Sequence, residues 1–168
     1  MPKIIKERQI VDDSWKVLVL AENETPETLR LPIGPLLVPL AVWQARKMEL
    51  IHRNWEHGEP LGVWLDPGDS AEAVADALAD LTVIGIHFPR FADGRGYSTA
   101  RLLRERHGFR GELRAFGDIG QDQVFFLHRV GFDAFALGEY DPEAVDDVFA
   151  SFPEVYQAAA NAPQPLLR

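Results

Sequence analysis

The chain has 168 residues, of which 46% are hydrophobic and 26% are charged, a balance typical of one soluble globular domain. It contains no cysteine, which excludes disulfides, thiolate nucleophiles and iron–sulfur ligation by this chain. The formal net charge of −9 argues against general nucleic-acid binding, because that function requires a basic surface.

No membrane span is expected, because the chain has no apolar run of about 18 residues. The longest candidate, "LPIGPLLVPLAVW", is interrupted by prolines at positions 32, 35 and 39. The basic N-terminus "MPKIIKERQ" leads into "VDDSWK" and not into the apolar region of a signal peptide. We therefore expect a cytoplasmic protein.

Residues 1–58 predict an N-terminal cap of strands and one helix. The stretch "KIIKERQIVDDSWKVLVLAE" is typical of one or two strands, or of a hairpin with Asp12 and Asp13 at its turn. The proline-rich stretch 22–39 predicts a loop. Pro39 then begins a helix that ends at Gly58.

From residue 59 onward, short apolar runs alternate with helical patterns. An Asp69–Glu72 capping box, an N-cap at Ser98, stops at Gly108 and Gly131 and an N-cap at Asp141 mark the helix ends. The pattern predicts strands at 61–67, 82–88, 112–117 and 133–138, and helices at 69–81, 98–107, 122–130 and 141–152.

Four consecutive strand–helix units predict an α/β fold with a parallel sheet. Four units are half of an eight-stranded α/β barrel, so a half-barrel-like sheet and an open parallel, doubly wound sheet are both compatible with the pattern. We expect one domain over residues 1–168, with an N-terminal cap (1–58), a βα core (59–152) and a C-terminal tail (153–168).

Ligands of parallel α/β folds bind at the carboxyl ends of the strands, and polar residues gather there in this sequence. Arginine forks and exposed helix N–H groups favour an anionic or phosphate-bearing ligand. The alternative is structural, with a plain Asp–Gly turn, a serine cap and a loop-fixing aspartate. The candidate ligand-binding residues are Arg90, Asp93, Arg95, Tyr97, Ser98, Asp118 and Gln121.

His87 and Asp66 each follow or end a predicted strand at the same edge, and either could act as an acid–base group. A core histidine is the alternative interpretation of His87. The sequence contains no metal-binding signature, no nucleotide-binding glycine motif and no serine elbow, so no cofactor is evident and no catalytic motif is visible.

Residues 90–114 hold seven arginines against three acidic residues, a local charge of +4 (7 − 3) in an acidic protein. Arg101, Arg104 and Arg106 could form a docking face for an acidic partner, or they could be solvated helix residues, with Arg101 and Glu105 as an i, i+4 pair. Phe125 and Phe126 are adjacent on one predicted helix, so they cannot both point into the protein core. One of them could cover a neighbouring helix or a partner chain.

Several sequence blocks between residues 91 and 133 resemble those of a bacterial family called domain of unknown function 934. They are "F-x-D-G-R-G-Y-S" from Phe91, "G-E-L-R-A-x-G-D" from Gly111, a "D-Q" pair and "R-x-G-F-D" from Arg129, with a looser "DDSW" near the N-terminus. The family carries an oxidoreductase label, and its members are associated with sulfur assimilation alongside sulfite reductase.

The resemblance implies an accessory protein of assimilatory sulfate or sulfite reduction, docking to sulfite reductase or to an acidic electron donor. An oxidoreductase, or another enzyme or sensor for a small anionic ligand at the carboxyl edge of the sheet, is the alternative. A structural homodimer joined through an uncovered strand edge is a third interpretation.

Overall fold

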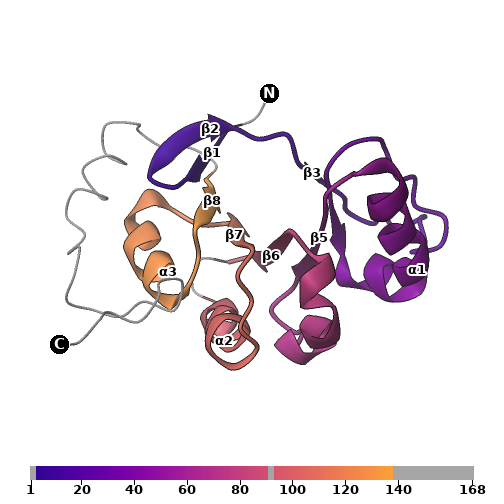
Figure 1. Ribbon diagram of the computed structural model, residues 1–168. Coiled ribbons are helices and arrows are strands. Elements are labelled where there is room, and N and C mark those ends of the chain that lie inside the picture. Colours follow the sequence, from indigo (N-terminus) through magenta and orange to yellow (C-terminus); the bar gives the residue numbers. More distant parts are fainter. Residues whose placement is uncertain (1–2, 91–92, 138–168) are drawn as a thin grey trace.

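A computed structural model describes residues 3–90 and 93–137, and it shows a curled, half-barrel-like sheet with helices on one face (Figure 1). The strands are β1 (Lys3–Lys6), β2 (Gln9–Asp12), β3 (Lys16–Val17), β4 (Leu36–Pro39), β5 (Leu61–Leu65), β6 (Val83–Phe88), β7 (Glu112–Gly117) and β8 (Ala134–Ala136). The helical elements are α1 (Leu40–His57), η1 (Ala71–Asp80), α2 (Arg95–Arg101), η2 (Leu102–Arg106), η3 (Gln121–Gln123) and α3 (Val124–Val130).

The sheet has the order β2-β1-β8-β7-β6-β5-β4-β3. Strands β3 to β8 are parallel and lie side by side in chain order, which is the arrangement of half an α/β barrel. The β1–β2 hairpin adds two antiparallel strands beside β8. The α/β class and the half-barrel shape are therefore confirmed, whereas the helix predicted at 141–152 lies outside the described residues.

Residues 1–58, predicted as a cap, supply strands to both edges of this sheet. The hairpin turn is at Glu7 and Arg8, both with positive φ, so the prediction of a turn at Asp12–Asp13 was wrong. A two-residue hairpin loop needs this left-handed backbone, which the sequence signals poorly when neither residue is glycine or asparagine.

The proline-rich stretch also contains a strand that the sequence did not predict. All four residues of β4 are buried, and they pair with β5 in parallel register. Pro39 is tolerated because it is the last residue of the strand and the N-cap of α1. The predicted end of α1 is confirmed, since Gly58 caps it in the left-handed conformation.

Two helices begin at residues that differ from the predicted ones. Helix η1 is capped by Ser70, whose hydroxyl accepts from the Glu72 N–H, and not by Asp69. Helix α2 begins at Arg95, three residues before the predicted cap Ser98. The predicted stops at Gly108 and Gly131 are confirmed, and both glycines have positive φ.

The two faces of the sheet are covered differently. The convex face packs the apolar residues of β4 to β7 against α1, η1, α2 and α3 in the main core. On the concave face, a second cluster joins Leu37, Trp64 and Val83 with Trp15 and Phe116. Trp15 lies in the short segment that links β2 at one edge to β3 at the other, so this segment crosses the concave face (Figure 1).

Candidate functional site

The carboxyl ends of β5, β6 and β7 bring several predicted site residues to one edge of the sheet. Asp66 follows β5, His87 and Arg90 lie at the end of β6, and Asp118 follows β7. The Asp118 N–H donates to the Phe88 carbonyl at 2.7 Å, which ties this loop to β6. Gln121 begins η3, three residues after Asp118.

Asp93 and Arg95 form a closed pair at the start of α2. The Asp93 carboxylate accepts from the Arg95 backbone N–H at 3.1 Å and from its guanidinium at 3.1 and 2.8 Å. Hydrogen bonds from the Arg95 side chain lower the pKa of Asp93 to about 2. An anionic ligand would therefore have to displace Asp93 from Arg95.

Tyr97 and Ser98 have different surroundings. Tyr97 packs edge-on against Phe88, with ring centroids 5.7 Å apart, and burial raises the pKa of its hydroxyl. Ser98 is exposed within α2, and its backbone carbonyl accepts from Leu102. The N-cap role predicted for Ser98 was wrong because Asp93 holds the first turn of the helix instead.

His87 and Asp66 are in direct contact. The Nδ1 atom of His87 lies 2.8 Å from Oδ1 of Asp66. The imidazole stacks on Phe116, with centroids 5.1 Å apart, and meets the edge of Trp64 at 5.6 Å. The parallel register explains the pair, because Leu65 lies opposite Ile86 and the next residues along the two strands are Asp66 and His87.

A groove of about 430 Å³ opens beside this pair, at the carboxyl ends of β4 and β5. Its walls are mainly apolar, and its polar side chains are two carboxylates and one amide. They include Leu20, Leu40, Gln44, Trp64, Asp66 and Asp69. Within residues 3–90 and 93–137, no group of three or more histidine or acidic residues is placed to hold a metal ion.

The arginine-rich segment divides into exposed and buried members. Arg101 and Arg106 are exposed, and Arg101 pairs with Glu105 at 3.3 Å, which is the i, i+4 contact of the structural alternative to a docking face. Arg104 is only 4% exposed, which removes it from the predicted docking face. Its guanidinium donates to the carbonyls of Gly131, Phe109 and Gly111 and pairs with Asp133.

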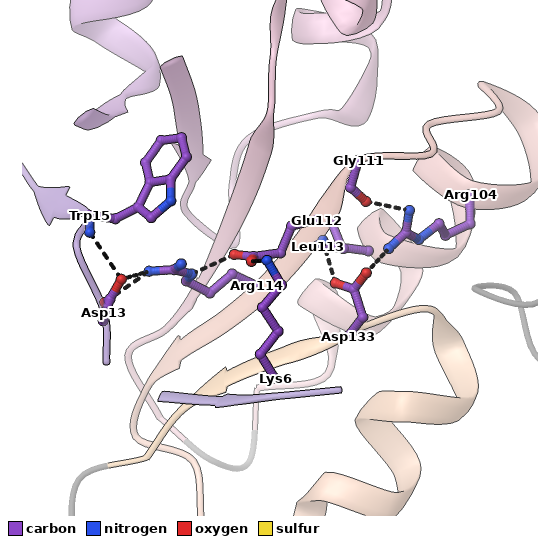
Figure 2. Close-up of polar contacts among 9 residues, drawn as sticks. All are labelled: Lys6, Asp13, Trp15, Arg104, Gly111, Glu112, Leu113, Arg114 and Asp133. Atoms are coloured by element: carbon purple, nitrogen blue, oxygen red, sulfur yellow. Dashed lines mark hydrogen bonds and ion pairs between the residues drawn. The ribbon is translucent and has the colours of Figure 1, made fainter. Parts of the chain in front are cut away.

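Arg114 is the centre of a buried ionic network on the concave face (Figure 2). It donates to Asp13 at 3.0 and 3.1 Å and to Glu112 at 2.8 Å, and Lys6 pairs with the other oxygen of Glu112 at 2.9 Å. Asp13 also accepts from the Trp15 N–H. The network therefore fastens β1 and the β2–β3 link to the middle of the sheet.

A second groove, of about 340 Å³, lies between α2 and α3. It is lined by Tyr97, Arg101, Phe126, Arg129 and Val130. Phe126 is 59% exposed, whereas Phe125 packs against the core, so the two phenylalanines face different ways as predicted. Sequence reasoning missed Arg129, although its position three residues after Phe126 places both on one helix face.

No helix in the described part of the chain combines the length and the apolar character that crossing a membrane requires. In comparisons with known proteins, the sequence profile of a family described as "Bacterial protein of unknown function (DUF934)" matches residues 62–167. The search of curated proteins found no match. The matched range includes β6 to β8, nearly all of β5 and every residue that lines the α2–α3 groove, whereas most of the residues that line the groove beside His87 and Asp66 precede it.

Proposed function

The chain belongs to the DUF934 family of bacterial proteins of unknown function, and we propose that it is an accessory protein of sulfite reduction that docks to sulfite reductase or its electron donor. The link to sulfur assimilation comes from the family resemblance described above. The observation that carries the docking role is the groove between α2 and α3, where an exposed phenylalanine lies beside two arginines.

The composition of this groove fits a protein interface. Aromatic residues and arginine supply a large share of the binding energy at interfaces, particularly where an aromatic anchor is surrounded by polar groups. Phe126 and Val130 supply the apolar part, and Arg101 and Arg129 supply positive charge. The partner surface should therefore be acidic around an apolar centre.

Local charge also explains how such a partner would be selected. The whole chain has a formal charge of −9, so an acidic partner is repelled by most of the surface and attracted by the arginines of this groove. Charge complementarity of this kind sets the encounter rate and the orientation more than the final affinity. A salt-sensitive complex is the expected result.

A tagged pull-down from the native host, grown on sulfate as the sole sulfur source, tests this function. We expect sulfite reductase or its electron donor to be retained at low salt and lost at high salt. Phe126→Ser with Arg129→Glu should abolish retention, whereas Arg110→Glu, an exposed arginine outside this groove, is the matched control. Equal retention by both variants would contradict docking at this groove.

The alternative is an oxidoreductase, another enzyme or a sensor that binds a small anionic ligand through Arg90 and Arg95. It has less support because Asp93 already occupies the Arg95 guanidinium. A rise in melting temperature with phosphate, sulfate or sulfite that is lost in Arg90→Ala would favour this alternative through ligand linkage.

A further inference from the structure

The groove between α2 and α3 is built from one face of each helix. Tyr97 and Arg101 lie four residues apart on α2. Phe126, Arg129 and Val130 follow i, i+3, i+4 spacing on α3. The two helices lie side by side and contact each other (Figure 1). The depression between two packed helices is a surface that can accept the side-chain ridge of a further helix.

Each wall of the groove carries one arginine, and none of the described residues that line it is acidic. On α2, the half-exposed Arg101 pairs with Glu105, which is equally exposed. Such ion pairs contribute little to stability, so a carboxylate of a partner can replace Glu105. On α3, Arg129 lies over the ring of Phe125, and no acidic side chain in the described part of the chain pairs with it. The groove therefore offers a cation on each wall to an acidic ligand.

The size of the groove restricts how a protein partner can enter it. A typical interface buries about 800 Å² on each partner, whereas this groove has a volume of about 340 Å³, which is room for a few side chains only. All its lining residues belong to helices α2 and α3, so it offers no strand edge to which an extended peptide could pair. A helix fits this surface, because its side chains at i, i+3 and i+4 project together into a groove.

We propose that the partner fills this groove with an acidic amphipathic helix. The apolar stripe of that helix packs on Phe126 and Val130, and its acidic residues pair with Arg101 and Arg129. Because the two arginines come from different helices, the partner helix carries acidic residues on both sides of its stripe. This inference rests on the docking function, since both use the same groove, and it adds the element of the partner that docks.

Titration of the ¹⁵N-labelled full chain with a synthetic helix tests this mode of binding. The probe is a peptide of about 18 residues that has leucine at i, i+3, i+4 and i+7 positions and glutamate on both sides of the leucine stripe. One control peptide has lysine in place of every glutamate, and the other has the same composition in scrambled order. We expect the acidic helix to shift the side-chain Nε signals of Arg101 and Arg129, and both controls to cause much smaller shifts. No shift with the acidic helix, or equal shifts with the scrambled peptide, would overturn the proposal.

Substitutions of exposed groove residues provide the second arm, and a thermal melt verifies that each variant folds. Arg129→Glu should weaken binding of the acidic helix by at least about tenfold, because it places a like charge against the peptide. Phe126→Ser should weaken binding by a similar factor through the lost apolar contact. Arg110→Glu, at an exposed position outside the groove, is the matched control and should leave the affinity almost unchanged. Equal affinity in Arg129→Glu and Arg110→Glu would contradict binding at this groove.

The docking function and the partner helix fail in different experiments. Retention of sulfite reductase or its electron donor that depends on Phe126, together with no binding of the acidic helix, would refute the helix and leave the docking function. Binding of the acidic helix without retention of either protein would refute the docking function and leave the helix. Light scattering tests a second copy of this chain as the occupant. A dimer that Phe126→Ser converts to a monomer would overturn the proposal.

Discussion

Arg101 and Arg104 lie three residues apart in one helical stretch, yet they have opposite environments. Arg101 is 55% exposed and lines the α2–α3 groove, whereas Arg104 is buried and donates to three backbone carbonyls. Arg114, in the same arginine-rich segment, is buried as well. A cluster of like residues in sequence therefore contains two groups, one that holds the fold together and one that is accessible to a partner.

Among substitutions that test this division, the largest loss of stability is expected in the buried network. Arg114→Met should lower the free energy of unfolding by about 4 kcal/mol, because Asp13 and Glu112 would remain buried near each other without their shared cation. Urea denaturation measures this change. Arg106→Met is the matched control and should change stability by less than about 0.5 kcal/mol. Similar effects of the two substitutions would refute the division.

Arg104→Met should cost about 3 kcal/mol, since three buried carbonyls lose their donor and Asp133 loses its counter-charge. Arg101→Met removes the neighbouring exposed arginine and should leave the urea midpoint almost unchanged. An Arg104 variant as stable as wild type would show that this side chain does not hold the loops before β7 and β8.

Asp13→Asn tests how firmly the β2–β3 link is fastened. The substitution keeps the shape of the side chain but removes the charge that Arg114 contacts. We expect a loss of about 2 kcal/mol, the range for a buried hydrogen bond to a charged group. Hydrogen exchange of the link should increase at the same time, and unchanged exchange would argue that Trp15 alone holds this segment.

Much of the fold was predictable because local signals agreed with the tertiary structure. The apolar runs of β5, β6 and β7 and the glycine stops at Gly58, Gly108 and Gly131 required no long-range information. Strand β4 was missed because its flanking prolines normally indicate a loop, and only pairing with β5 makes those four residues a strand. The Glu7–Arg8 turn was missed because neither residue favours positive φ.

The site was predictable only in part. His87 and Asp66 were both candidates, but their contact depends on the register between β5 and β6. Arg104 lies four residues after the buried Ala100, which is a local signal of burial. Two of its carbonyl partners, Phe109 and Gly111, are in the turn that follows, whereas Gly131 is 27 residues away in sequence. Arg129 could have been found from its i, i+3 spacing with Phe126, but its proximity to Arg101 needed the packing of α2 on α3.

The smallest predicted effect concerns pH. Burial lowers the pKa of His128 from its ordinary value of 6.5, so the folded state binds that proton more weakly than the unfolded chain does. The contribution of the neutral His128 imidazole to the free energy of unfolding is therefore fully present above pH 6.5, and it is lost as the pH falls through the lowered pKa. Urea titrations of His128→Gln and wild type between pH 7 and pH 5 should therefore converge on acidification. A constant difference across that range would contradict this assignment.

The most direct test of the docking claim is photo-crosslinking in the native host with p-benzoylphenylalanine at position 126. Trp55 provides the matched control, because it is an even more exposed aromatic residue, at 79%, on α1 at the other end of the sheet (Figure 1). We predict one discrete crosslinked polypeptide from position 126 that is absent from position 55 and disappears with Arg129→Glu. No adduct at position 126, or the same adduct from both positions, would contradict docking at the α2–α3 groove.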